Sequence, residues 1–157
     1  MSRPIPLQAP PSDRPVADAD AKLWTNVIAE VPLFAGLNRR HIRKVADTGR
    51  IARFHHGTAI IKAGEPGDAF YVIIDGEVSI RRRGLPALSL GPQSFFGELA
   101  LLDGGARSAT VTAKGPVVCL AITRTRFLKL LRDEPTIAIA LLQEVAQRLR
   151  ALQQSAL

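Results

Sequence analysis

The spacing of hydrophobic residues divides the chain into a helical part, a β-rich part and a second helical part. Before residue 49, apolar side chains recur every three to four positions, which is typical of amphipathic helices. The pattern predicts one helix from about residue 19 to residue 30 and a second helix from Asn38, a capping residue, to about Thr48. Between them, Pro32 and Gly36 interrupt the periodicity and predict a tight corner.

Residues 49–123 have the pattern of short β-strands. Apolar runs recur as IARF, TAIIK, AFYVII, EVSIR, ALSL, SATVTA and VVCLAI, and turn sequences rich in Gly, Pro and Asp separate them. Many short strands at close spacing favour an antiparallel sandwich or barrel. The dipeptide Asp75-Gly76 is typical of a two-residue hairpin, so it predicts a turn between two of these strands.

Helical periodicity returns in residues 124–157. It predicts a helix that begins at Thr123 or Thr125 and ends before Pro135, followed by a final helix from about Thr136 to Gln153. Apolar residues of the final helix follow the i, i+3, i+4, i+7 pattern. Its segment 137–142 is apolar on all sides, so we expect this half of the helix to be covered on more than one face.

Length and composition indicate one globular domain at residues 19–157, preceded by a Pro-rich tail at residues 1–18 that we expect to be disordered. The longest purely apolar runs contain only six residues, so we expect no membrane helix and no signal peptide. Cys119 is the single cysteine, and we expect it to be buried on a strand. A lone cysteine indicates a reducing compartment, so the expected location is cytoplasmic.

The charge indicates the kind of partner, and the absence of a catalytic motif favours a binding protein over an enzyme. The net charge of +7 favours anionic partners, but the basic residues are scattered and few aromatic residues accompany them, so solvated faces are favoured over a nucleic-acid surface. No catalytic triad, phosphate-binding Walker loop or carboxylate pair is present. The three histidines have no zinc-ligand spacing with the cysteine, so we expect neither catalytic residues nor a metal site.

The stretch FGELALLDGGARSAT, residues 96–110, carries the candidate chemistry. A short helix beginning near Phe96 or Gly97 would present free N–H groups, which suit a phosphate. Arg107 could bind phosphate oxygens with two parallel hydrogen bonds, and the Glu98 carboxylate could accept a hydrogen bond from a sugar hydroxyl. These residues are consistent with a sugar-phosphate pocket, but an arginine and a glutamate in a loop more often form a structural salt bridge, which these residues alone favour for Glu98 and Arg107.

The spacing G-E-L-A-x6-R-S-A-T resembles the phosphate-binding cassette of the cyclic-nucleotide-binding domain family, which includes catabolite-activator-type regulators, cyclic-nucleotide-dependent kinases and cyclic-nucleotide-gated channels. A second family signature is KAGEPGDAFYVIIDGEVSI, at residues 62–80. The resemblance covers about residues 23–152. It implies an α+β, mainly β fold: an antiparallel β-roll or jelly-roll barrel (49–123) with N-terminal helices (19–48), a short phosphate-binding helix inside the barrel, and two C-terminal helices (124–157), the last acting as a lid.

The resemblance also implies ligand-binding roles. It places the backbone N–H of Gly97 at the cyclic phosphate, Glu98 at the ribose 2′-hydroxyl and Arg107 at the phosphate. The residues of this stretch that the resemblance implies as ligand-binding are Phe96, Gly97, Glu98, Leu99, Ala100, Arg107, Ser108 and Ala109.

Residues outside the stretch are expected to enclose the base. Ile80 and Leu88 are candidates for its apolar wall, with ordinary core packing as the alternative. Arg148 follows Arg107 by 41 positions, a spacing that resembles that of a lid arginine in bacterial cyclic-nucleotide-gated potassium channels. A solvated arginine is the alternative for this position. We expect Asp103 to be a turn residue and residues 81–83 to form a solvated hairpin face.

These features predict a regulatory sensor whose ligand is cAMP or cGMP and which needs no other cofactor. We expect cAMP, the commoner ligand of bacterial-looking members, and an output through repositioning of the last helix toward a protein partner or a second copy. The chain ends shortly after the final helix, which leads us to expect a stand-alone module. Two alternatives remain: an excised sensory domain of a channel or cAMP-regulated enzyme, and a DNA-associated regulator without its own helix-turn-helix.

Overall fold

The computed structural model describes residues 25–155, so the predicted tail and the domain boundary at residue 19 lie outside the described residues. Residues 25–29 are helical and lead into the short helix η1 (Pro32–Phe34). The further helices are α2 (Arg39–Thr48), α3 (Leu99–Leu102), α4 (Arg124–Asp133) and α5 (Pro135–Ser155). The strands are β1 (Arg50–Phe54), β2 (Ala59–Ile61), β3 (Ala69–Arg81), β4 (Leu88–Leu90), β5 (Phe95–Phe96) and β6 (Thr110–Thr123).

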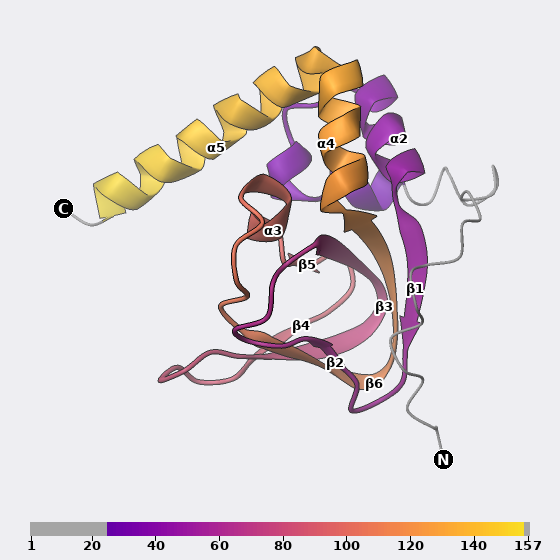
Figure 1. Ribbon diagram of the computed structural model, residues 1–157, viewed down its shortest axis with the longest axis vertical. Helices are drawn as coiled ribbons and strands as arrows, with labels where there is room; N and C mark the ends of the chain where they lie inside the picture. The colour runs from indigo at the N-terminus through magenta and orange to yellow at the C-terminus, as the bar shows by residue number, and fades with distance from the viewer. Residues whose placement is uncertain (1–24, 156–157) are drawn as a thin grey trace.

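The strands form one antiparallel sheet that curls into a roll, with the helices gathered at one end (Figure 1). Its order is β1-β6-β3-β4, while β2 also pairs with β6 and β5 also pairs with β3. In the described part of the chain the end strands β1 and β4 do not pair with each other, so the roll is not closed into a hydrogen-bonded barrel. The predicted α+β class with an antiparallel β-roll is confirmed, but the described residues contain more helix than strand, so the fold is mixed rather than mainly β.

The predicted hairpin at Asp75-Gly76 is wrong, because β3 continues through it as a single strand of 13 residues. The pairing of β3 with β6 shifts register on both sides of Asp75, which marks a bulge. Gly76 has a φ of +91°, and a Cβ there would lie 2.3 Å from the carbonyl oxygen of Pro116. A bulge and a tight hairpin turn both favour Gly at a positive φ, so the dipeptide alone cannot distinguish them.

Two apolar cores hold the elements together. The first lies between the helices and the adjacent end of the sheet, where Phe34 packs against Phe70 and Phe127 at centroid distances of 5.9 and 6.2 Å. The second lies inside the roll, where the rings of Tyr71 and Phe96 stack at 5.2 Å. Because Phe96 belongs to the second core, it anchors the chain immediately before the GELA segment.

The predicted helix starts are confirmed by their caps. The Asn38 side chain accepts a hydrogen bond from the His41 amide, and the Thr123 side chain accepts one from the Arg126 amide. Helix α4 ends at Asp133, and α5 begins at Pro135, which suits a first helical position because proline has no N–H to satisfy. Thr123 therefore marks the point where β6 passes into α4, and Asn38 marks the turn from η1 into α2.

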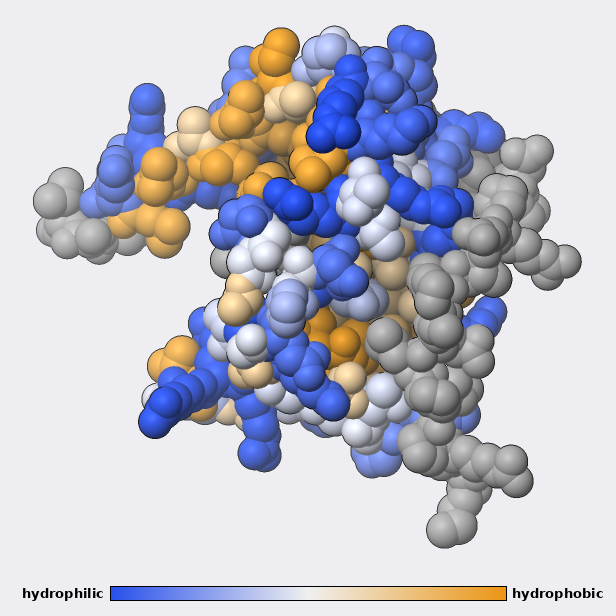
Figure 2. Space-filling model, viewed as in Figure 1, coloured by the Kyte–Doolittle hydropathy of each residue, from blue (hydrophilic) through white to orange (hydrophobic). Residues whose placement is uncertain are grey.

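Helix α5 is less covered than its sequence predicts. Ile137 and Leu141 are buried, but Ile139 is 57% exposed and Leu142 is 68% exposed, so the expected covering on more than one face is wrong. Helix α5 packs against η1 and α4 and then extends away from the roll (Figure 1). Figure 2 shows the resulting apolar surface along α5. Among the described residues, no helix is both long and apolar enough to cross a bilayer.

Cys119 is buried in β6, as predicted. Burial raises the pKa of the Cys119 thiol to about 12, because the charged thiolate would lose its hydration. The thiol therefore stays protonated at neutral pH and is inert toward thiol reagents in the folded protein.

Candidate functional site

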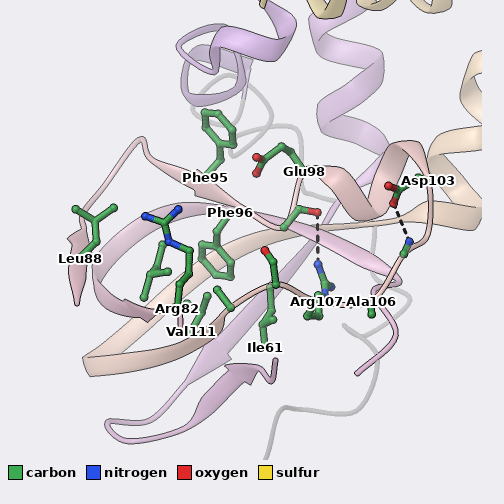
Figure 3. A pocket seen from close by; sticks show the side chains of 15 residues that line it. Ile61, Arg82, Leu88, Phe95, Phe96, Glu98, Asp103, Ala106, Arg107 and Val111 are labelled. Carbon is green, nitrogen blue, oxygen red and sulfur yellow. Dashed lines mark hydrogen bonds between the residues drawn. The ribbon is translucent and has the colours of Figure 1, made fainter. Parts of the chain in front are cut away.

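A cavity of about 300 Å³ opens in the roll beside α3 (Figure 3). Its walls come from β3, β4, β5, the start of β6 and the segment 103–109. The lining residues are Ile61, Ile80, Arg82, Leu88, Phe95, Phe96, Gly97, Glu98, Asp103, Gly105, Ala106, Arg107, Ser108, Ala109 and Val111. The cavity thus brings together eight predicted positions: Ile80, Leu88, Phe96, Gly97, Glu98, Arg107, Ser108 and Ala109.

Arg107 is held against backbone carbonyls at the cavity wall. Its Nη2 donates to the Ala69 carbonyl oxygen at 2.7 Å and its Nη1 donates to the Gly97 carbonyl oxygen at 3.4 Å. Burial lowers the pKa of Arg107 from its usual value, and the negative charge of nearby acidic groups partly opposes the shift. Arginine nevertheless remains cationic at neutral pH. The site therefore contains a fixed, half-buried positive charge.

The alternative of a structural Glu98–Arg107 salt bridge is not what the structure shows. Between described residues, the ion pairs are Lys44–Glu134 and Lys129–Asp133, and neither involves the cavity. Glu98 and Arg107 both line the cavity but do not pair, so the carboxylate and the guanidinium can each face a ligand.

Gly97 allows the chain to pass close to Arg107. Its φ is +79°, and a Cβ at this position would lie 2.7 Å from Arg107 Nη1 and 3.1 Å from the Ala69 carbonyl oxygen. The predicted helix start near Phe96 or Gly97 is wrong, because Phe96 ends β5 and Gly97 is not helical. Helix α3 begins at Leu99, includes Ala100 and has only four residues. A single turn contributes little dipole, so the charge of the site rests on Arg107.

The two sequence signatures meet at this site. The Gly64 amide donates to the Arg107 carbonyl at 2.9 Å, and the Arg107 amide donates to the Glu65 carbonyl at 2.8 Å. The Gly67 amide donates to the Gly105 carbonyl at 3.1 Å. The AGEPGD turn therefore fixes the backbone that carries Arg107. The two sequence signatures are thus parts of one hydrogen-bonded unit.

Three apolar residues form a row across the sheet at one side of the cavity. In the strand register, Ile80 of β3 is opposite Leu88 of β4 and also opposite Val111 of β6. Directly opposed residues project from the same face of a sheet. Ile80 and Leu88 were predicted as wall residues, whereas Val111 was missed because its alignment depends on the register between distant strands.

Other predicted residues lie differently. Within the described residues Arg148 does not line the cavity; its guanidinium lies 5.9 Å from the ring centroid of Phe95, which does. Asp103 is a turn residue as predicted, since its Oδ1 accepts from the Gly105 amide at 2.7 Å. Residues 81–83 are exposed, as predicted, and Arg82 among them also lines the cavity. Across the described ranges, no three His, Cys, Asp or Glu side chains gather as a metal site.

Comparison with known proteins agrees with this geometry. The family model of the cyclic nucleotide-binding domain matches residues 51–134, more than half of the chain. The chain is 32% identical over 117 residues to a cAMP-dependent protein kinase regulatory subunit of Dictyostelium discoideum, covering 69% of this chain. It is 38% identical over 112 residues to the subunit of the same name from Emericella nidulans, covering 70% of this chain. The matches span 36% and 27% of the length of these two relatives.

Solved structures share the fold. The N-terminal domain of a transcriptional regulator from Streptomyces coelicolor superposes with a TM-score of 0.76 at 33% identity, covering 82% of this chain and 95% of that one. The catabolite activator protein of Thermus thermophilus superposes with a TM-score of 0.65 at 32% identity, covering 80% of this chain and 61% of that one. The regulatory domain of Toxoplasma gondii PKA, crystallised with cAMP, superposes with a TM-score of 0.67 at 26% identity, covering 83% of this chain and 51% of that one. The fold and the cavity thus define a β-roll domain of the cyclic-nucleotide-binding class. The chain belongs to the cyclic nucleotide-binding domain family.

Proposed function

We propose that the cavity binds cAMP and that the domain is a cAMP-responsive regulatory module. The observation that carries this proposal is the half-buried Arg107 guanidinium, which forms no direct ion pair with a carboxylate within the described residues and which lies against Gly97 in a cavity of ligand size. A fixed cation in a partly desolvated pocket favours an anionic ligand, and the planar guanidinium suits two phosphate oxygens.

Further donors near Arg107 support a phosphate at this place. In the described part of the chain, the Gly97 and Ser108 amides have no hydrogen-bond acceptor, and the exposed Ser108 hydroxyl is likewise unbonded. Backbone N–H groups and a hydroxyl beside an arginine are the donors that an oxyanion requires. We assign the cyclic phosphate to Arg107, Gly97, Ser108 and Ala109.

Glu98 and the apolar row account for the rest of the ligand. We assign the ribose 2′-hydroxyl to the Glu98 carboxylate as hydrogen-bond acceptor, and the position of Glu98 next to Gly97 on the cavity wall supports this assignment. The row of Leu88, Ile80 and Val111 offers an apolar surface for the base. The choice of cAMP over cGMP is supported by the relatives, two of which are named for cAMP dependence and one of which was crystallised with cAMP.

The regulatory output is assigned to α5. Its first half is anchored by the buried residues Ile137 and Leu141, whereas Leu149 and Leu152 in its second half are exposed. Arg148 contacts Phe95, which lines the cavity, so a ligand that changes the surroundings of Phe95 acts directly on α5. In the proposed mechanism the ligand favours a conformation in which α5 packs over the cavity and changes the surface offered to a protein partner or a second copy.

Glu98→Ala is expected to weaken cAMP binding by about tenfold or more, because a hydrogen bond to a charged group contributes about 1.5–3 kcal/mol. Calorimetric titration with cAMP and 2′-deoxy-cAMP separates this contact from general effects. The wild type should bind the deoxy ligand more weakly than cAMP, while Glu98→Ala should bind the two almost equally. Glu98→Gln, which keeps an acceptor oxygen, is the matched control. Its preference for cAMP over 2′-deoxy-cAMP should fall between that of the wild type and that of Glu98→Ala. The ribose assignment is wrong if Glu98→Ala prefers cAMP as strongly as the wild type does.

Saturating cAMP is expected to shorten the distance between α5 and the roll. Two exposed positions, Gln147 on α5 and Lys62 beside the cavity, can be changed to Cys and spin-labelled, because buried Cys119 stays unreactive. Pulsed electron paramagnetic resonance should then show a shorter and narrower distribution of distances between the two spin labels when cAMP is bound. The same labelled protein carrying Arg107→Ala should not respond. An unchanged distribution in a protein shown by calorimetry to be saturated with cAMP would contradict the lid mechanism.

A further inference from the structure

Arg82 lies at the cavity although no role in phosphate or ribose binding is assigned to it. Arg81 is the last residue of β3 and is opposite Thr110 of β6. Side chains alternate between the two faces of a strand, so Arg82 shares the face of Ile80, two positions earlier. Both residues line the cavity, whereas the neighbouring Arg81 and Arg83 do not. The chain therefore directs only the middle arginine of RRR toward the ligand space.

The Arg82 side chain is available to a ligand. Among the described residues it forms no hydrogen bond and no ion pair, although its guanidinium carries five N–H donors. In Figure 3 it stands between Leu88 and Phe96, while Arg107 lies at the opposite side of the cavity. The two arginines thus mark two ends of one cavity, and the amides of Gly97 and Ser108, which suit a phosphate, belong to the Arg107 end.

The surroundings of Arg82 fit a purine base. The row of Leu88, Ile80 and Val111 forms an apolar floor, and Arg82 follows directly from the strand that supplies its centre. A guanidinium can lie over the face of a purine, and its N–H groups match the N7 acceptor on the edge of that ring. A base with one face on the floor would present its other face and this edge to the rest of the cavity, which the exposed Arg82 lines.

We propose that Arg82 contacts the purine base of the bound cyclic nucleotide, donating to N7, and that it makes the cavity select purine over pyrimidine ligands. This assignment rests on the proposed function. It gives the exposed hairpin after β3 a part in ligand recognition, and it places a base-contacting cation on the roll itself, separate from α5 and Arg148.

The test compares three neighbouring arginines, changed singly to Ala, by calorimetry at about 0.15 M ionic strength. Arg82→Ala should weaken cAMP binding by about tenfold, whereas Arg81→Ala and Arg83→Ala, which remove the same charge, should stay within about twofold. Replacing cAMP by 7-deaza-cAMP should lower the affinity of the wild type by about tenfold and the affinity of Arg82→Ala by only about twofold. The wild type should also prefer cAMP to cyclic CMP by a factor that falls in Arg82→Ala.

Three outcomes would overturn the assignment. If Arg82→Ala binds cAMP like the wild type while Arg107→Ala does not bind, Arg82 is not a base contact but the proposed function stands. If all three variants lose affinity equally, the effect is general electrostatic attraction. Failure of the wild type to bind cAMP contradicts the proposed function, and the role of Arg82 with it. Because Arg82 is exposed, thermal unfolding of Arg82→Ala should match the wild type and show that the variant is folded.

Discussion

Arg107→Ala is expected to weaken cAMP binding by at least about 100-fold. Truncating one partner of a partly buried, charge-assisted pair typically costs 2–5 kcal/mol, and a 100-fold loss corresponds to about 2.7 kcal/mol. The loss is large because the alanine removes the fixed cation and leaves the phosphate only neutral donors. Calorimetric titration of wild type and variant with cAMP measures it, with micromolar affinity expected for the wild type.

Two controls separate this loss from other causes. Arg107→Lys keeps the charge but not the planar fork, so its affinity should fall between those of wild type and Arg107→Ala. Arg53→Ala removes an equal charge from an exposed position on β1 and should bind like the wild type. Arg107 also donates to the Ala69 and Gly97 carbonyls, so circular dichroism should establish that Arg107→Ala is folded. Binding by the folded variant within about threefold of the wild type would exclude Arg107 as the phosphate ligand.

Gly76→Ala is expected to lower the free energy of unfolding by about 3 kcal/mol or more. The new Cβ would lie 2.3 Å from the Pro116 carbonyl oxygen, and only a backbone shift in β3 or β6 can relieve this contact. Residue 76 also has a φ of +91°, which an L side chain adopts at a cost of about 1 kcal/mol or more. Since β3 and β6 are the central strands of the sheet, the strain reaches both cores. Urea unfolding followed by circular dichroism measures the difference.

Gly57→Ala is the matched control for this substitution. Gly57 has a similar φ of +84°, but a Cβ there would meet nothing within 4 Å. Gly57→Ala therefore introduces the backbone strain without the close contact. It should lower the free energy of unfolding by only about 1 kcal/mol. If the two variants are equally stable, the bulge at residue 76 adjusts more easily than the structure indicates, and the close approach of β3 to β6 does not determine stability.

Local sequence signals predicted the helices well but could not decide how strands join. Asn38 and Thr123 cap helices as expected, because capping depends on residues within one turn. The dipeptide Asp75-Gly76 has the same local preference in a bulge and in a hairpin, and only the pairing with β6 decides between them. The exposure of Ile139 and Leu142 likewise depends on which elements pack against α5, and helical periodicity carries no information on that packing.

In the candidate site, too, residues in one local segment were predictable, whereas residues brought in by strand pairing were not. Gly97, Glu98 and Arg107 could be predicted because they lie in one short segment with a recognisable spacing. Val111 and Arg82 could not, since they reach the cavity only through the register of three strands and the alternation that follows Ile80. The contact of Arg148 with Phe95, rather than with the cavity, depends on the path of α5 and was not predictable from its spacing to Arg107.

The most direct test of the account is a titration of ¹⁵N-labelled protein with cAMP, followed by two-dimensional amide NMR spectra. The account predicts saturable shifts at micromolar to low-millimolar ligand, largest for the amides of Gly97, Glu98, Ser108 and Ala109, followed by smaller shifts along α5. Absence of saturable shifts at these four amides would contradict it, as would shifts confined to the basic residues Arg39 and Arg40 of α2.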